Sequence, residues 1–470
     1  MIAGRYGRAV LFGAEVRAGV SKKGALLALC AGLAWLGFAQ EPEAGAARRL
    51  SPDEAVDLAL KSNLTLESAR ITAGMKRRKA DTAWNVLVPS LDISAAATGS
   101  LYKAEPASPL APAPVQWRFI PLSASASLSL NAALFEGMRN LRLDYEAGII
   151  ALDKAKSQLE RDVRKAYYNM LLIQENIALL RESLAAAERR LETARANYRA
   201  GLAPELTMLQ AQVAMENMKP TIDQTENGFK LSMAQFAMNL GLPYDTRFEL
   251  IPLEQVPAFA PLEVKELISA ASRNKPDIME LKQSILLLES QRKATFYKIF
   301  TPSLTLSLSM HPTLWDNVSG WYAVDDAWKT QQSSWTFSLG FRLNGLFPFG
   351  SERQGLRDID DNLRLLHVGL AQAVRGTEIE IYSAILNLEK ARITAEAQGR
   401  TVDLAERTYR LTETAYRAGL QDLLEVQNAE LELRRARIGI LEQNFTYLQG
   451  LIDLEYAVGV PFGTLSGGIR

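Results

Sequence analysis

Cysteine and histidine are nearly absent from this chain of 470 residues, which has one cysteine and two histidines. The cysteine, Cys30, lies in an apolar run near the N-terminus that resembles a cleavable export signal, so we expect a mature chain without thiols. Such a chain has no disulfide bonds and no thiolate nucleophile. The histidines, His311 and His367, are too far apart in sequence to suggest a shared zinc site. The sequence predicts no metal site and an exported protein stabilised by core packing or by assembly.

Signatures of nucleotide binding and of hydrolysis are also missing. The chain has no G-x-x-x-x-G-K-[ST], no G-x-G-x-x-G after a strand and no G-x-S-x-G. Acidic and basic residues balance at 53 each, so no nucleic-acid surface is indicated. Almost all carboxylates lie on periodic helix faces near Lys or Arg, which is typical of solvated coiled-coil surfaces. We therefore predict a protein that is not an enzyme, needs no cofactor and binds no nucleic acid.

The apolar run at the N-terminus, residues 24–38, spans only about 15 residues, which is short for a membrane-spanning helix. It follows two lysines and ends at Gly37-Phe38-Ala39, where the small residues suit signal peptidase. We predict that residues 1–39 are a signal peptide. Lipidation at Cys30 is a weaker alternative, because Leu29 stands where a lipoprotein signal needs a small residue.

Proline is absent from two long stretches, residues 137–200 and 350–418. Helices of that length reach roughly 95–105 Å, which is more than a single globular core needs. The first stretch carries apolar residues at alternating spacings of three and four, from Val163 to Tyr198, as the seam of a coiled coil does. A second seam, from Ile381 to Tyr416, is poorer in large apolar residues. Each long helix is predicted to end at a glycine, Gly201 or Gly419, and a shorter helix then returns.

Four shorter segments alternate between apolar and hydroxyl-bearing residues, which predicts strands with one apolar and one polar face. One interpretation of this alternation is an ordinary sheet packed against a layer of helices. Three details favour a membrane instead: polar faces rich in Ser and Thr, a length of about ten residues, and tryptophans near the strand ends. The residues predicted to face lipid are Leu128, Leu306, Phe337, Leu339 and Phe341.

Four strands cannot close a barrel, and open sheet edges are not tolerated in lipid. We therefore expect several copies of the chain to share one barrel. Three copies would supply about twelve strands, enough to leave a water-filled lumen. These patterns predict a membrane β-barrel shared by several copies, together with long α-helical coiled coils.

The sequence contains an internal repeat, in which similar motifs recur at a spacing of roughly 212–218 residues. Each copy is predicted to run helix, strand, strand, long helix, helix, as a duplicated structural unit does. The first copy is residues 40–255, with strands at about 87–102 and 118–133 and helices at about 52–84, 137–200 and 204–240. The second copy is residues 256–470, with strands at about 302–312 and 333–345 and helices at about 262–298, 351–418 and 421–458.

This ordered set resembles the TolC family of outer-membrane efflux channels over essentially all of the mature chain. The resemblance rests on residues 50–60 (LSPDEAVDLAL) with Asn63, on the strand pairs that end at Leu-Phe, and on the two Tyr-Arg-Ala-Gly-Leu turns. The resemblance implies a homotrimer in the outer membrane, in contact with its lipid, whose membrane β-barrel continues across the periplasm as a long α-helical coiled-coil barrel. It also implies two partners, a periplasmic adaptor (membrane fusion) protein and an inner-membrane pump of unknown class.

In this family the helix-turn-helix tips form the closed gate and the surface where the adaptor docks. Carried over by position, the docking residues are Gly201, Leu202, Gly419 and Leu420. The corresponding gate residues are Glu425, Asn428, Gln421, Tyr416, Tyr198 and Thr207. Asn428, Gln421 and Thr207 stand where some members have charged residues, so only a ring of Glu425 is expected. Glu425 could equally be an ordinary solvated carboxylate, and the two tyrosines could be the last rungs of their seams.

The sequence therefore predicts a trimeric outer-membrane exit channel of a tripartite efflux or type I secretion system. It would act as a passive, gated duct across the periplasm and the outer membrane. The alternative is an exported coiled-coil scaffold or a periplasmic adaptor without a pore. Adaptors have a single long hairpin flanked by small soluble β modules, whereas this chain predicts two hairpins with amphipathic strand pairs.

Overall fold

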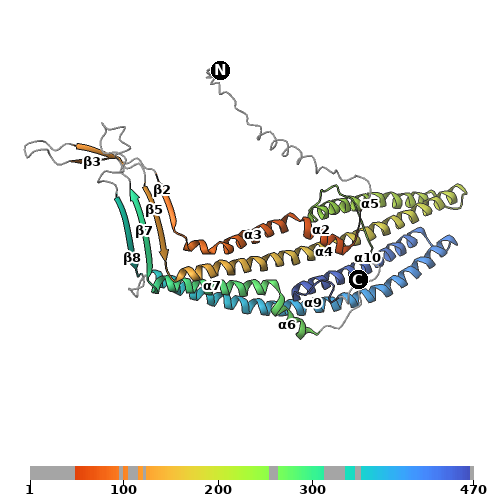
Figure 1. Ribbon diagram of the computed structural model, residues 1–470. Helices are drawn as coiled ribbons and strands as arrows, with labels where there is room; N and C mark the ends of the chain where they lie inside the picture. Colours follow the sequence, from red (N-terminus) through yellow and green to blue (C-terminus); the bar gives the residue numbers. More distant parts are fainter. Residues whose placement is uncertain are drawn as a thin grey trace, which may run out of the picture. The chain divides into compact units, whose positions relative to one another are not determined.

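The computed structural model describes residues 48–94, 99–103, 115–119, 123–252, 263–311, 334–343 and 351–465. The predicted signal peptide, residues 1–39, lies outside the described residues. The chain divides into two compact units, residues 1–48 and 49–470. All the described helices and the four-stranded sheet belong to the second unit (Figure 1).

Two short helices, two strand pairs and a helical hairpin make up the first half of this unit. The elements are α2 (Pro52–Ser62), α3 (Leu64–Asp81), the 3₁₀ helix η1 (Ala83–Leu87), β2 (Ser90–Ser94), β3 (Gly99–Lys103), β4 (Val115–Phe119), β5 (Ser123–Leu130), α4 (Ala133–Arg199) and α5 (Glu205–Asn239). Two three-residue strands, β1 (Arg48–Leu50) and β6 (Phe248–Leu250), pair with each other beside the hairpin.

The second half repeats this order with one strand pair. Its elements are α6 (Val264–Asn274), α7 (Pro276–Phe300), β7 (Ser303–His311), β8 (Ser334–Arg342), α9 (Ser351–Arg417) and α10 (Leu423–Val458). Helices α4 and α9 have 67 residues each. At 1.5 Å per residue, each is about 100 Å long.

The single helices predicted over 52–84 and 262–298 are wrong, because each is broken into two. Asn63 has an extended backbone between α2 and α3, and its side-chain oxygen accepts a hydrogen bond from Leu66 N at 3.0 Å, which caps α3. Lys275 separates α6 from α7, and Pro276 follows it. The residue before a proline avoids helical angles, so Lys275 is extended.

The strand predicted over 87–102 is also wrong in its extent. Residues up to Leu87 form η1, β2 begins at Ser90 just after Pro89, and β3 forms a separate two-stranded sheet with β4. The predicted partner, 118–133, ends as strand β5 at Leu130. There the side chain of Asn131 accepts a hydrogen bond from Leu134 N at 3.1 Å, so α4 begins one turn before the predicted residue 137.

The four-stranded sheet joins the two halves of the chain. Its strand order is β2-β5-β7-β8, and all neighbours are antiparallel. The central pair, β5 and β7, brings together strands from different halves, with Leu128 opposite Leu306. The sheet follows the ends of α3 and α7 and precedes α4 and α9, so it lies at the end of the long helices away from the hairpin turns (Figure 1).

The coiled-coil seam of α4 is buried along most of its length. Its buried members are Val163, Met170, Ile177, Leu180, Ala187, Leu191 and Ala194. On α9 only Ile381, Leu388 and Ala391 of the predicted seam are buried, as the weaker apolar pattern indicates. The hairpin of the second half is therefore held by fewer buried side chains of its long helix.

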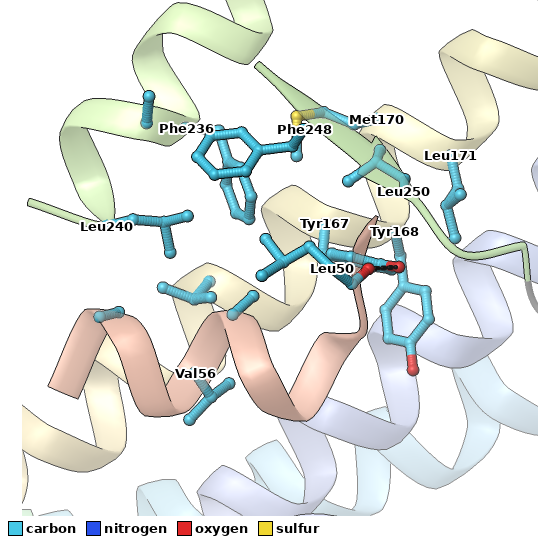
Figure 2. Close-up of a cluster of buried hydrophobic side chains, with 14 of the residues drawn as sticks. Leu50, Val56, Tyr167, Tyr168, Met170, Leu171, Phe236, Leu240, Phe248 and Leu250 are labelled. Atoms are coloured by element: carbon cyan, nitrogen blue, oxygen red, sulfur yellow. Dashed lines mark hydrogen bonds between the residues drawn. The ribbon is translucent and has the colours of Figure 1, made fainter. Parts of the chain in front are cut away.

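The hydroxyl of Tyr167 is hydrogen-bonded inside the largest hydrophobic cluster, where α2, α4, α5, β1 and β6 meet (Figure 2). The hydroxyl of Tyr167 donates to the carbonyl of Leu50 at 2.8 Å and accepts from the amide of Ile251 at 2.9 Å. It thereby ties β1 and the residue after β6 to the middle of α4. Burial raises the pKa of Tyr167 to about 12, so it is a neutral hydroxyl at any physiological pH.

Glycine ends all four hairpin helices, and in two of them it is also packed tightly. Gly241 and Gly459 have φ of 76° and 74°. A Cβ on Gly241 would lie 2.0 Å from Ser62 O, and one on Gly459 would lie 2.7 Å from Asn274 O. Each turn thus inserts against the break between the two short helices of its own half. At the same place the Asn63 amide donates to Asn239 O at 2.7 Å, which caps the end of α5.

Replacing Gly241 by alanine should therefore destabilise the protein by more than about 3 kcal/mol, because backbone strain and a clash with backbone atoms add. Gly201 is the matched control, since its φ is 71° but a Cβ there meets nothing within 4 Å. Gly201→Ala should cost only the left-handed backbone penalty of about 1–2 kcal/mol. Urea unfolding of detergent-purified protein measures both; equal costs would contradict the close approach.

Candidate functional site: the two-faced sheet and the hairpin tips

Apolar side chains form continuous rows across the four-stranded sheet. Leu128, Leu306 and Leu339 are opposite one another on β5, β7 and β8. Further rows on the same face contain Phe337 and Phe341 of β8. Side chains of residues paired in antiparallel strands lie on one face, so all five residues predicted to contact lipid share a face.

The other face of the sheet carries rows of hydroxyl groups. Ser90, Ser127, Ser307 and Ser338 are opposite one another on all four strands. The hydroxyls of Ser90 and Ser127 are 2.8 Å apart, and those of Ser307 and Ser338 are 2.5 Å apart. These hydroxyls hydrogen-bond to one another across neighbouring strands. The row is therefore polar and contains no charged residue.

Both outer strands of this sheet have an open side. Within the described residues, β2 pairs only with β5 and β8 pairs only with β7. The outward N–H and C=O groups of these strands therefore lack strand partners in a single copy of the chain. In water such edges are exposed pairing sites, and in lipid each unsatisfied group costs several kcal/mol.

The two hairpin tips have the same backbone geometry. At the first tip Leu202 N donates to Asn197 O at 2.8 Å and Gly201 N donates to Tyr198 O at 3.0 Å. At the second tip Leu420 N donates to Ala415 O and Gly419 N donates to Tyr416 O, both at 2.9 Å. These are Schellman motifs, in which the glycine takes positive φ.

Each tip presents one large apolar side chain to solvent. Leu202 and Leu420 are both 79% exposed, although leucine at this position of a Schellman motif often packs back on its helix. The predicted docking residues therefore form two similar surfaces, each with a bare leucine beside a glycine.

The predicted gate residues do not form one cluster within a single copy. Glu425, Asn428 and Gln421 are exposed near the start of α10, and Thr207 is half-buried on α5. Glu425 makes no ion pair with any other described residue. Any ring of Glu425 would have to come from several copies of the chain.

The two tip tyrosines have different surroundings. Tyr416 packs against a cluster that contains Leu191 and Met215 of the first hairpin and Leu423 of the second. Burial raises the pKa of Tyr416. Tyr198 lies outside the cluster and is 41% exposed. The core-rung interpretation therefore fits Tyr416, whereas Tyr198 is available at the surface.

Ion pairs between α4 and α10 are a feature that the sequence did not reveal. Arg190 forms a short ion pair with Glu430, and their side chains are only 11% and 16% exposed. Glu182 pairs with Arg437 at 3.2 Å, and Lys165 pairs with Asp453 at 2.8 Å. Charges of opposite sign thus alternate along both helices and connect the two hairpins. No local pattern in one sequence could match such partners, which are hundreds of residues apart.

The pKa of Glu430 lies above its ordinary value of 4.5, because burial penalises the carboxylate more than Arg190 favours it. A cleft of about 310 Å³ opens beside the pair, between α4, α9 and α10. In this cleft Arg417 pairs with Glu413 at 2.8 Å, so much of its charge is compensated. The Arg190–Glu430 pair is therefore the most enclosed polar link between the hairpins among the described ion pairs.

Breaking this link by Arg190→Met should cost about 3–5 kcal/mol, because a buried carboxylate is left without its partner. Replacing both residues, Arg190→Met with Glu430→Leu, should restore most of the stability. Arg435→Met is the matched control, since Arg435 and Glu432 are each 65% exposed, and it should cost less than about 1 kcal/mol. Urea unfolding at neutral pH measures all three.

The pH dependence has a definite sign. Because the folded pKa of Glu430 is raised, the stability from its protonated form is complete below 4.5 and is lost as pH rises through the folded pKa. Removing Arg190 raises that pKa further, so the deficit of Arg190→Met should shrink on acidification. A deficit that stays constant with pH would mean that Glu430 is not the group left unpaired.

No described helix combines the length and the apolar character needed to cross a bilayer. No three His, Cys, Asp or Glu side chains among the described residues come close enough to hold a metal ion.

The architecture is that of solved outer-membrane channels, with a helical barrel domain and a β domain. The CmeC outer membrane channel of Campylobacter jejuni is similar with a TM-score of 0.71 and 16% identity. The similarity covers 96% of this chain and 94% of that chain. The predicted fold class is therefore confirmed at the level of this architecture.

This chain belongs to the outer membrane efflux protein family, whose model matches residues 55–235 and 267–460. It is 23% identical over 318 residues to Nodulation protein T of Rhizobium leguminosarum bv. trifolii, covering 67% of this chain and 66% of that protein. It is 23% identical over 352 residues to TtgC of Pseudomonas putida, described as a probable efflux pump outer membrane protein, covering 71% and 69%. The chain thus spans about two-thirds of the length of these relatives.

Family membership confirms the resemblance seen in the sequence and the predicted location in the outer membrane. The family is one of channel proteins rather than of enzymes. The roles of individual residues at the tips and on the sheet remain predictions.

Proposed function

We propose that this protein is the subunit of a homotrimeric exit channel that crosses the outer membrane and extends into the periplasm. The observation that carries the proposal is the four-stranded sheet, with apolar and hydroxyl rows on opposite faces and two unpaired edges. Lipid requires those edges to be paired, and copies of the same chain can pair β8 of one with β2 of the next. Three copies would supply about twelve strands around a water-filled lumen.

In this barrel the apolar face contacts outer-membrane lipid and the hydroxyl face lines the lumen. Leu128, Leu306, Phe337, Leu339 and Phe341 are the lipid-facing residues. The serine row that includes Ser127 and Ser338 faces water. In this orientation apolar side chains contact the lipid, and hydroxyl groups contact the water and solutes in the lumen.

A second apolar seam on α9 supports assembly along the helices as well. It is exposed in a single copy and follows roughly heptad spacing on a different face from the buried seam. Its members are Leu365, Val368, Ile379, Tyr382, Leu386, Ile393, Leu404 and Leu411. Monomeric soluble proteins rarely expose so many large apolar side chains along one helix, so the seam is assigned to another copy of the chain.

The hairpin tips are the proposed contact with a periplasmic adaptor protein, which connects the channel to an inner-membrane pump. Leu202 and Leu420, beside Gly201 and Gly419, supply two apolar docking points per subunit. The description of TtgC as an efflux pump outer membrane protein supports this tripartite arrangement. Transport is then passive diffusion through a gated duct, and the pump supplies the energy.

The gate is proposed to lie just inside the tips. The charged residue of the gate is Glu425. One Glu425 side chain from each subunit would together form a negative ring that favours cations. Tyr198, Gln421, Asn428 and Thr207 are proposed as neighbours of this ring. Tyr416 is proposed to act through the tip cluster, because it packs between the hairpins rather than at the surface.

Leu339→Arg tests the lipid face. Charge at the middle of the membrane should cost roughly 2–4 kcal/mol and lower the amount of folded protein in the outer membrane. Ser338→Arg is the matched control, because its side chain lies on the opposite face of the same strand. The measurement is detergent-extracted folded protein in outer-membrane fractions. Equal loss in both variants, or none in either, would show that the face is misassigned.

Glu425→Gln tests the gate in planar-bilayer recordings of purified protein. The variant should keep its conductance and lose part of the cation preference, because three negative charges leave the narrowest point. Glu432→Gln is the control, since Glu432 is exposed about two turns further along α10. Unchanged selectivity in Glu425→Gln would remove this residue from the gate.

The competing function is an exported scaffold or an adaptor protein without a pore. Such a protein would be released from membranes by salt washing, whereas the channel should need detergent. It would also give no conductance in planar bilayers. The two-faced sheet favours the channel, because a scaffold has no need for a strand face of exposed Phe and Leu.

A further inference from the structure

Four consecutive basic residues end helix α3, next to the sheet. They are Lys-Arg-Arg-Lys at positions 76–79, and the helix ends two residues later at Asp81. The chain as a whole has a formal net charge of zero, so this run is a local excess of positive charge. Basic residues near a helix C-terminus also interact favourably with the helix dipole, which is the structural alternative to a binding role.

Among the residues that the structure describes, two of these four charges have no neighbouring carboxylate, and a third has only a long, exposed ion pair. Lys76 Nζ lies 2.9 Å from Asp144 Oδ1, which accounts for one charge. Arg77 reaches Asp81 only at 3.7 Å, and both side chains are well exposed. Arg78 and Lys79 are exposed and form no ion pair with any described residue.

Directly after the basic run, the surface becomes apolar. Trp84 in η1 is 60% exposed, and the residues that lead from it into β2, at 86–88, are also exposed apolar side chains. Phe135, at the start of α4, is exposed as well. Exposed apolar residues thus follow the cations directly along the chain and lead into the first strand of the sheet.

The spacing between tryptophan and cations matches the head-group layer of a bilayer. Tryptophan rings favour the boundary between hydrocarbon and head groups. Lys79 lies two residues before the end of α3 and Trp84 lies in the 3₁₀ helix that follows, so at 1.5–2.0 Å per residue the five steps between them span at most about 10 Å. The head-group layer on each side of the hydrocarbon core is about 5–7 Å thick, so the basic side chains lie at the depth of lipid phosphates.

We propose that the end of α3, residues 76–84, binds the phosphate head group of an anionic phospholipid in the periplasm-facing leaflet. Arg77, Arg78 and Lys79 supply the charge, and Trp84 supplies the apolar contact beside the acyl chains. The inference rests on the proposed function, because it requires the apolar face of the sheet to be in the membrane.

The corresponding helix of the second half shows why the site is on α3. Helix α7, which ends at Phe300, has no run of four cations: Arg292 is held in an ion pair by Asp360 of α9, Lys293 follows it, and Lys298 is the single basic residue of the last turn. Asp358 and Asp361 also lie on α9 near this depth. The cations of α7 are therefore fewer and more scattered than those of α3, whose basic run has only Asp144 and Asp81 at ion-pair distance among the described carboxylates.

Titration of the protein in a neutral detergent with phosphatidylglycerol or phosphatidylcholine tests the site, with bound lipids counted by native mass spectrometry. The wild type should prefer phosphatidylglycerol. The variant Arg77→Gln, Arg78→Gln, Lys79→Gln should bind it roughly a hundredfold more weakly at low salt, from the loss of three cations at an anionic surface. Its melting temperature without lipid should stay close to that of the wild type.

The matched control is Arg400→Gln, Arg407→Gln, Arg410→Gln, which removes three exposed basic residues from α9 far from the sheet. It should keep the preference for phosphatidylglycerol. Undiminished binding by the α3 variant, or equal loss in the control, would overturn the inference. The α3 variant should still conduct in planar bilayers. Loss of the lipid preference with intact conductance would support the lipid site independently of the channel function. A wild type that never conducts would instead overturn the channel, and with it this inference.

Discussion

Strand register is the constraint on which the rest of this protein depends. Side chains alternate along a strand, so a shift of one residue between neighbours would move every leucine to the hydroxyl face. The observed register keeps Leu128, Leu306 and Leu339 in one row and four serines in another. The separation of lipid from lumen, the need to close the edges and the position of the helix ends at the membrane surface all follow from this alignment.

The sequence predicted those parts of the fold whose cause is local. Unbroken alternation located β5, β7 and β8, and the absence of proline located the long helices α4 and α9. The break at Lys275 has a local cause, Pro276, which the helix prediction over 262–298 overlooked, whereas the cause of the break at Asn63 is partly distant. The turn at Gly241 packs against Ser62, and a gap in α2–α3 makes room for it, but nothing near residue 62 announces that approach.

The candidate site divides in the same way. Gly201 and Gly419 could be predicted, because a left-handed turn at the end of a helix depends on adjacent residues. The Arg190–Glu430 pair could not, since its partners are 240 residues apart and each resembles an ordinary charge on a solvated helix face. Tyr198 and Tyr416 have similar sequence contexts but different burial, and only the packing of Leu423 between the hairpins separates them.

The pairing of β5 with β7 has a consequence for the order of events during biogenesis. Strand β5 ends at Leu130 and β7 begins at Ser303, so roughly 170 residues separate the two strands that pair at the centre of the sheet. Without the second half, the apolar face of the β2–β5 pair cannot extend into the four-stranded sheet. A chain that ends between the two halves should therefore leave the edge of β5 unpaired and be prone to aggregation.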